Sequence, residues 1–195
     1  MKNKILFILT LLMILPLSSC YNKENREEIL KVYNWADYID EDVLANFPAW
    51  YKQQTGKNIR IIYQTFDINE VMLTKIERGH EDYDVVCPSE YIIERMLRKD
   101  LLLPIDTCFG KTPNYLKNVS PYIVEQIDAT SNSQRIAHHY AVPYMWGTCG
   151  ILYNKVHVPL KDAQTWGTLW NRKYRGRLLM KDSYRDSYGT ALIWA

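Results

Sequence analysis

The sequence predicts an α/β fold in which a mostly parallel β-sheet is covered by helices. Three short runs rich in β-branched and aromatic residues occur at 29–35, 58–63 and 83–86. Two segments with apolar residues at helical spacing, 40–54 and 67–78, lie between these runs. Strands that alternate with helices in this way form βαβ units, and the strands of such units run parallel.

Each of these two helices carries its own boundary signals. Gly56 and Gly79 are placed to end them, because glycine readily adopts the left-handed conformation that follows a helix. Asp67 and Glu70 have the spacing of a capping box at the start of the second helix. Pro48 lies inside the first helix and is expected to kink or split it.

The pattern continues beyond the third strand. A helix is predicted over 91–99, and 113–133 is expected to be a loop with a helical turn. A further strand is predicted within 141–154 and a further helix over 166–174. The chain stops inside a helical pattern at 188–195 without a capping signal, so we expect it to be truncated at its C-terminus.

The first twenty residues predict export. Lys2 and Lys4 precede an apolar run at 5–17 that is too short to span a bilayer, which is the pattern of a signal peptide at 1–19. Cys20 follows two serines and resembles the cysteine of the bacterial lipobox, which carries a lipid on its thiol. An ordinary signal peptide with a coincidental cysteine is the alternative. The polar residues 20–28 are then predicted to form a flexible tether.

Charge and cysteine content argue against nucleic acid and metal ions as partners. The chain has 24 Lys and Arg and 22 Asp and Glu, and only Lys2 and Lys4 lie before Cys20, so the exported chain balances at 22 against 22. A neutral chain without a basic tract is not expected to bind nucleic acid. Cys87, Cys108 and Cys149 could form one disulfide, and their spacing predicts neither a metal site nor a cofactor.

Aromatic and acidic side chains gather where the predicted strands end. Trp35, Asp37 and Tyr38 follow the first strand, and Ser89 and Tyr91 follow the third. Ligands bind at the carboxyl ends of the strands of a parallel sheet. Aromatic faces and carboxylates together suit an organic cation, through the ring quadrupole and charge-assisted hydrogen bonds.

Each of these residues also has a purely structural interpretation. Trp35 and Tyr38 could belong to the rim of the core, Ser89 could be only an N-cap and Asp37 only a turn residue. A catalytic interpretation has less support, because the sequence contains no nucleophile elbow, phosphate-binding loop, dinucleotide fingerprint or metal-ligand spacing. We therefore predict a binding protein and not an enzyme.

Five motifs together resemble the spermidine/putrescine-binding proteins of polyamine ABC importers. They occur in the family's order across nearly the whole exported chain. They are VYNWADYI at 32–39, FDINE at 66–70, YDVVCPS at 83–89, VPYMWGT at 142–148 and the segment 166–176.

The resemblance implies a two-lobed periplasmic-binding-protein fold that closes around its ligand. The first lobe, 29–144, would be nearly complete and the second, 145–195, only begun. It also implies a polyamine ligand, putrescine or spermidine, and an ABC permease of the inner membrane as partner. With Cys20 lipidated, the protein would be a monomeric lipoprotein of the periplasm.

The family's ligand contacts map onto Trp35 and Tyr38 in the first loop and onto Ser89 and Tyr91 in the second. Asp186 falls on an acidic family position that meets an amine. Ser183 falls where spermidine binders often carry another carboxylate, which leaves the choice of polyamine open. Other ligands for the same fold, such as a sugar, an iron chelate or a thiamine-like cation, are alternatives, and a secreted enzyme or adhesin is a further one.

Overall fold

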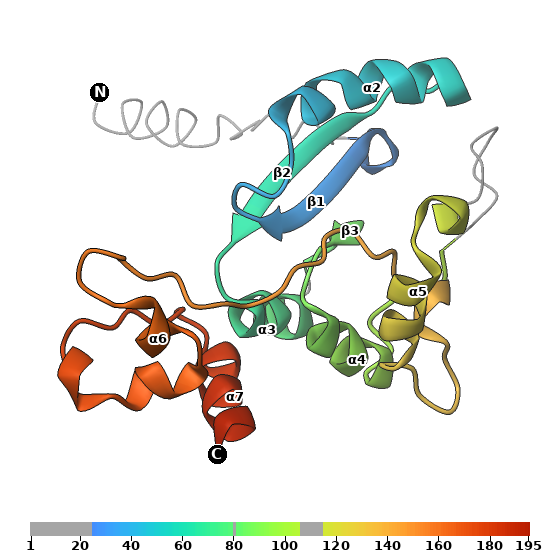
Figure 1. The fold of residues 1–195 in the computed structure, drawn as a ribbon. Coiled ribbons are helices and arrows are strands. Elements are labelled where there is room, and N and C mark those ends of the chain that lie inside the picture. Colours follow the sequence, from blue (N-terminus) through green and yellow to red (C-terminus); the bar gives the residue numbers. More distant parts are fainter. Residues whose placement is uncertain (1–24, 80, 106–114) are drawn as a thin grey trace, which may run out of the picture.

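A computed structural model of the chain describes residues 25–79, 81–105 and 115–195 (Figure 1). Its centre is a three-stranded parallel sheet in the order β2-β1-β3. The strands are β1 (Ile29–Trp35), β2 (Arg60–Phe66) and β3 (Val85–Val86). β1 and β2 pair along their whole length, from Ile29 opposite Arg60 to Trp35 opposite Phe66. The predicted α/β class is confirmed.

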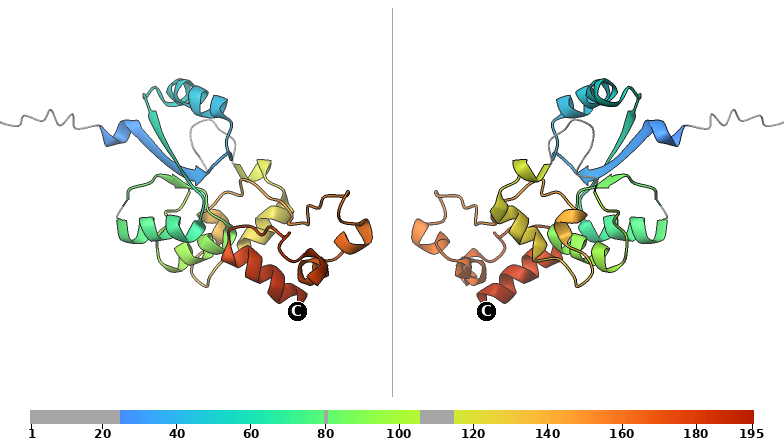
Figure 2. Two further views of the ribbon diagram at one scale, coloured as in Figure 1. Left: turned by 90° about the vertical axis from the view of Figure 1, so that its left-hand side faces the viewer. Right: turned by 90° about the vertical axis from the view of Figure 1, so that its right-hand side faces the viewer.

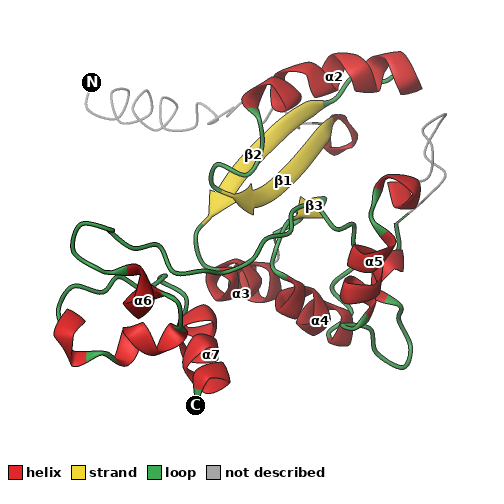
Figure 3. Cartoon of the chain, viewed as in Figure 1, coloured by secondary structure: helices red, strands yellow, loops and turns green. Residues whose placement is uncertain are grey.

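One face of the sheet carries the main core. Helices α3 (Asn69–Gly79) and α4 (Glu90–Arg98) lie on this face, and α2 (Glu41–Thr55) lies on the other (Figures 1 and 3). The buried cluster between the sheet and the two helices comprises Tyr33, Phe66, Met72, Leu73, Ile92 and Met96. No residue of α2 is buried. Most of the burial that holds the sheet therefore comes from α3 and α4.

Helix α2 is a single element with a clear beginning and end. The side chain of Asp40 accepts a hydrogen bond from the Asp42 N–H over 2.9 Å at its start. Gly56 ends it in the left-handed conformation, with φ at 75°. Pro48 lies inside the helix without splitting it. The loss of one backbone N–H does not interrupt a helix that is fixed at both ends.

A second buried cluster extends the first group of elements, which consists of the sheet and helices α2, α3 and α4. Helix α5 (Pro121–Asp128) and the short 3-10 helix η3 (Ala137–His139) pack against α4, with Leu97, Ile127 and Ala137 buried between them. A further 3-10 helix, η2 (Tyr115–Asn118), precedes α5. The predicted loop with a helical turn at 113–133 therefore contains a helix of two turns.

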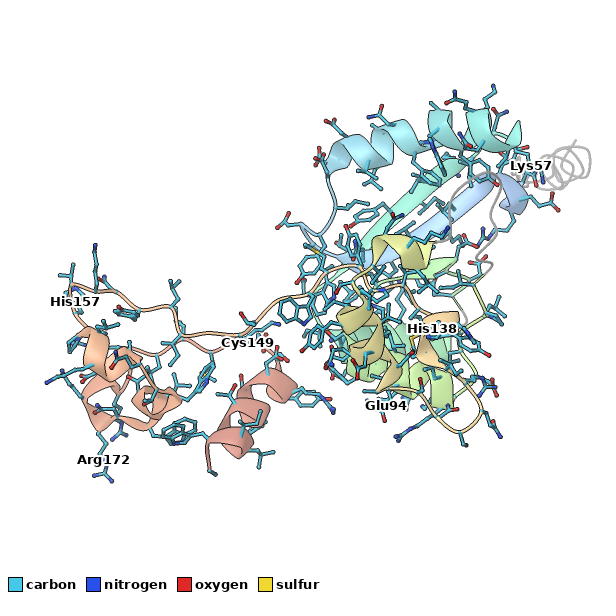
Figure 4. All side chains as sticks on the ribbon, turned by 45° about the vertical axis from the view of Figure 1, so that its right-hand side comes forward. Lys57, Glu94, His138, Cys149, His157 and Arg172 are labelled. Atoms are coloured by element: carbon cyan, nitrogen blue, oxygen red, sulfur yellow. The ribbon has the colours of Figure 1, made fainter. Side chains whose placement is uncertain are left out.

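A smaller group of elements follows at the end of an extended segment, residues 141–154. It contains α6 (Leu160–Ala163), the 3-10 helices η4 (Trp166–Trp170) and η5 (Arg172–Tyr174), and α7 (Tyr184–Trp194). The extended segment runs across the first group to reach it (Figures 1 and 2). Figure 4 shows Cys149 on this segment, with Glu94 and His138 on the larger group and His157 and Arg172 on the smaller one.

Two predictions in this region were wrong. Residues 141–154 form no strand, because within the described chain they have no strand to pair with; Leu152 is fully exposed. The single helix predicted over 166–174 is two 3-10 helices. The Asn171 side chain accepts a hydrogen bond from the Lys173 N–H over 3.0 Å, and such local bonds compete with a continuous helix.

The amino end of β1 is held by ion pairs. Arg26, in the 3-10 helix η1 (Arg26–Glu28), contacts Asp82 over 2.7 Å and Asp84 over 2.9 Å, and Lys31 also pairs with Asp82. These two cations hold the pKa of Asp82 well below its usual value. Residues 25–28, predicted as part of the tether, therefore belong to the fold, and 20–24 lie outside the described residues.

Candidate functional site

The carboxyl ends of the three strands meet at one edge of the sheet. The loops after β1, β2 and β3 leave from this edge, and α3 and α4 begin there (Figure 3). Side chains that follow different strands in the sequence are thereby brought together. The structure places the predicted residues 35–38 and 89–91 at this edge.

Trp35 and Tyr38 form an aromatic pair after the central strand. Their ring centroids are 6.1 Å apart. Trp35 is half-buried and packs on Phe66, with a centroid distance of 4.7 Å, so it belongs partly to the core. Tyr38 remains 42% exposed and can contact a ligand with its ring. Tyr144, from the extended segment, donates a hydrogen bond from its hydroxyl to the Tyr38 carbonyl.

Asp37 occupies the turn between these two aromatic residues. Its φ is 58°, a left-handed conformation that aspartate tolerates better than most residues. The interpretation of Asp37 as a turn residue therefore has a structural basis. Its side chain is exposed at the edge of the sheet.

Ser89 lies at the N-cap position of α4, but its side chain does not cap the helix. Its hydroxyl accepts a hydrogen bond from the Asn69 Nδ2 over 2.9 Å, and its N–H donates to the Asn69 Oδ1 over 3.2 Å. Asn69 begins α3 and is only 5% exposed. One buried amide therefore joins the loops that follow β2 and β3.

Tyr91 extends the same network. Its hydroxyl accepts from the Asn69 Nδ2 over 2.9 Å and donates to the Glu70 Oε1 over 3.0 Å. The guanidinium carbon of Arg185, in α7, lies 4.3 Å from the centroid of the Tyr91 ring. A cation at this distance is attracted by the ring quadrupole. The smaller group of elements thus reaches the sheet edge through α7.

Burial is the main reason why the pKa of Tyr91 is raised from 10.0 to about 12. The folded chain then keeps this hydroxyl protonated up to a higher pH than the unfolded chain does. Its contribution to stability is complete below pH 10 and is lost as the pH rises from 10 through 12. We expect the difference in melting temperature between the protein and a Tyr91→Phe variant to fall over that range. A difference that stays constant between these pH values would contradict this assignment.

Ser183 and Asp186 lie together at the start of α7. The Ser183 hydroxyl caps the helix by accepting from the Asp186 N–H over 3.3 Å. The Asp186 carboxylate pairs with Lys181 over 2.7 Å, and this contact is the main reason why the pKa of Lys181 is raised. Within the described residues, no hydrogen bond or ion pair joins Asp186 to the aromatic residues of the sheet edge.

Two residues of this site were not predicted as ligand contacts. Asn69 is the centre of the network, and Glu70 supplies a carboxylate next to Tyr91. The sequence FDINE was interpreted as the start of a helix and as one of the five family motifs, but not as a source of ligand contacts, and the helix begins at Asn69 and not at the predicted 67. Asn69 and Glu70 follow β2, just as residues 35–38 follow β1 and residues 87–91 follow β3. The rule that ligands bind at the carboxyl ends of strands could therefore have identified them as well.

The cysteines fall into different environments. Cys87 and Cys149 are free thiols, and burial raises the pKa of Cys87. Cys20, the predicted lipid-bearing residue, and Cys108 lie outside the described residues. Over the described ranges, no cluster of three or more His, Cys, Asp or Glu side chains could hold a metal ion, and no helix has the length and apolar character needed to cross a membrane.

Comparisons with known proteins identify the class. The sequence matches no family model. A solved structure from Listeria monocytogenes, a spermidine/putrescine ABC transporter protein, superposes with a TM-score of 0.69 at 36% identity, covering 85% of this chain and 47% of that one. The chain thus has the fold of the substrate-binding proteins of ABC transporters, and the predicted resemblance is confirmed.

The relatives are proteins that bind polyamines. The spermidine/putrescine-binding periplasmic protein of Escherichia coli K12 is 30% identical over 179 residues, which cover 91% of this chain and 47% of that protein. The putrescine-binding periplasmic protein PotF of the same organism is 36% identical over 128 residues, 66% of this chain and 31% of PotF. The chain therefore spans about half the length of the first of these relatives.

Proposed function

We propose that the chain is part of the solute-binding subunit of an ABC importer, which captures a polyamine in the periplasm and delivers it to the permease. The observation that supports this most directly is the composition of the sheet edge. It combines exposed and half-buried aromatic rings with the carboxylates of Asp37 and Glu70. Asp186 lies at the start of α7, the helix whose Arg185 reaches the Tyr91 ring. The similarity to spermidine/putrescine-binding and putrescine-binding proteins supports the same proposal.

Each predicted ligand contact has a distinct role in this proposal. The rings of Trp35 and Tyr38 lie along the aliphatic part of the polyamine, and carboxylates bind its ammonium groups. The Ser89 and Tyr91 hydroxyls take hydrogen bonds from the ligand in addition to those from Asn69. No bond is made or broken, so the protein needs no catalytic group and no cofactor.

The domain division is part of the same proposal. Residues 29–144 would form lobe one and 145–195 the beginning of lobe two, so that the extended segment is the connection between the lobes. Residues 1–19 would be removed as a signal peptide, and lipid on Cys20 would hold the monomeric protein at the membrane. The Arg185 contact is then a contact between the second lobe and the first, and Tyr144 binds Tyr38 at the end of lobe one.

The test is a calorimetric titration of the protein, as its own cells produce it, with putrescine, spermidine and spermine at two salt concentrations. We expect micromolar or tighter binding of at least one of them, weakened by salt because the attraction is electrostatic. A folded protein that binds none of the three would overturn the proposal. A neutral ligand such as a sugar would instead bind with an affinity that is indifferent to salt.

Asp186→Ala is expected to weaken binding of the preferred polyamine about tenfold, because a charge-assisted hydrogen bond to an ammonium is lost. Asp182→Ala is the matched control, since it removes the same charge from an exposed residue four positions away. Calorimetry of both variants measures the difference. Equal affinities for the two variants would remove Asp186 from the site.

A further inference from the structure

Glu70 is an acidic side chain of the sheet edge that has no basic partner among the described residues. It is half-buried and accepts a hydrogen bond from the Tyr91 hydroxyl over 3.0 Å. Interaction with Glu70 is also the main reason why the pKa of Tyr184 is raised. Over the described residues, no lysine, arginine or histidine lies within ion-pair distance of Glu70, whereas Asp186 is already paired with Lys181.

A partly buried carboxylate without a cation is unfavourable, because its remaining acceptor sites have lost water without gaining a charged donor. Two phenol hydroxyls are neutral donors and compensate it only in part. The carboxylate therefore provides a position at which an ammonium group would be stabilised. The hydroxyl of Tyr91 contacts this carboxylate, so the aromatic ring of Tyr91 lies next to the same position.

A cation of the chain already lies on that face. The guanidinium carbon of Arg185 is 4.3 Å from the Tyr91 centroid. Arg185 is exposed and stands in the first turn of α7, where the helix dipole disfavours positive charge. Its position is therefore not explained by stabilisation of its own helix. The contact with Tyr91 is an interaction that accounts for it.

We propose that Glu70 and the Tyr91 ring form one ammonium-binding position of the polyamine site, and that Arg185 is an internal cation that competes with the ligand for it. The inference rests on the proposed function and deepens it. An ammonium that donates to Glu70 would lie beside the Tyr91 ring, where it and Arg185 would repel each other. The ligand must displace Arg185 from the ring, so this arginine lowers the affinity for the polyamine.

Two substitutions separate the partners. Arg185→Ala removes the competitor and is expected to tighten binding of the preferred polyamine about threefold to tenfold. Glu70→Gln keeps the shape of the side chain but removes its charge, and is expected to weaken binding about tenfold. Both are measured by calorimetric titration with putrescine and spermidine, on protein as its own cells produce it.

Charge-matched controls distinguish a local effect from a change in the overall field. Arg172→Ala removes a positive charge from the smaller group of elements, away from α4 (Figure 4). Glu125→Gln removes a negative charge from the exposed face of α5. Neither residue contacts the sheet edge, so both controls are expected to change the affinity less than twofold.

The outcomes bear on different claims. Tighter binding by Arg185→Ala than by Arg172→Ala, together with weaker binding by Glu70→Gln than by Glu125→Gln, supports the inference. Equal affinities within either pair overturn it while the proposed function stands. If the unmutated, folded protein binds no polyamine, the proposed function fails and this inference fails with it.

Discussion

Met72→Ala is expected to lower the free energy of unfolding by about 3 kcal/mol, since truncating a buried methionine removes apolar contacts and leaves a cavity. Met72 is 0% exposed and belongs to the cluster that α3 and α4 form with the sheet. This cluster is the principal buried contact between the sheet and its helices. Urea denaturation, followed by far-ultraviolet circular dichroism, measures the change.

The neighbouring residue provides the control. Val71 precedes Met72 on the same helix but is 58% exposed. Val71→Ala should change the free energy of unfolding by less than about 0.5 kcal/mol, as is usual for surface positions. If the two variants lost equal stability, the packing of α3 against the sheet would be different from that described.

Asn69→Ala is expected to cost about 2 to 3 kcal/mol of stability and, under the proposed function, also to weaken polyamine binding. The substitution removes the amide that binds the Ser89 hydroxyl, the Ser89 N–H and the Tyr91 hydroxyl. Partly buried polar groups that lose a partner carry a desolvation cost of roughly 1 to 3 kcal/mol. The loops after β2 and β3 would then be less firmly held to each other.

A double-mutant cycle tests whether Asn69 acts through Ser89. The loss for Asn69→Ala combined with Ser89→Ala should be smaller than the sum of the two single losses, because the two side chains share hydrogen bonds. Asn58→Ala, at an exposed asparagine outside the network, is the control for the residue type. Additive losses in the cycle would show that the Asn69 and Ser89 side chains are not coupled.

The sheet and its helices could be predicted because their signals are local. Runs of β-branched and aromatic residues predicted the strands β1 and β2, and apolar residues at helical spacing predicted the helices α2, α3 and α4. Each prediction lies within a few residues of the observed bounds. Residues 141–154 have a similar apolar pattern but form no strand, because a strand also requires the backbone of a second segment. Their pattern contains no information about whether such a partner is adjacent.

The location of the candidate site was predicted, but the hydrogen bonds that connect its residues were not. The rule that ligands bind at the carboxyl ends of parallel strands pointed to Trp35, Tyr38, Ser89 and Tyr91 as candidate contacts, and all four lie at that edge of the sheet. It could not identify Asn69 as their common partner, because its hydrogen bonds join residues about twenty positions apart. The position of Arg185 over Tyr91 spans an even longer separation and depends on how the extended segment crosses the molecule.

The ion pairs of Arg26 have a mechanical consequence. A force applied through the residues before Asn25 enters the fold at the amino end of the central strand. Such a pull along β1 loads its hydrogen bonds to β2 and β3 in shear, so that many bonds resist together, and Arg26 passes part of the load to Asp82 and Asp84. Because the strands are parallel, their carboxyl ends, and with them the candidate site, lie at the opposite edge of the sheet from the point where such a force enters.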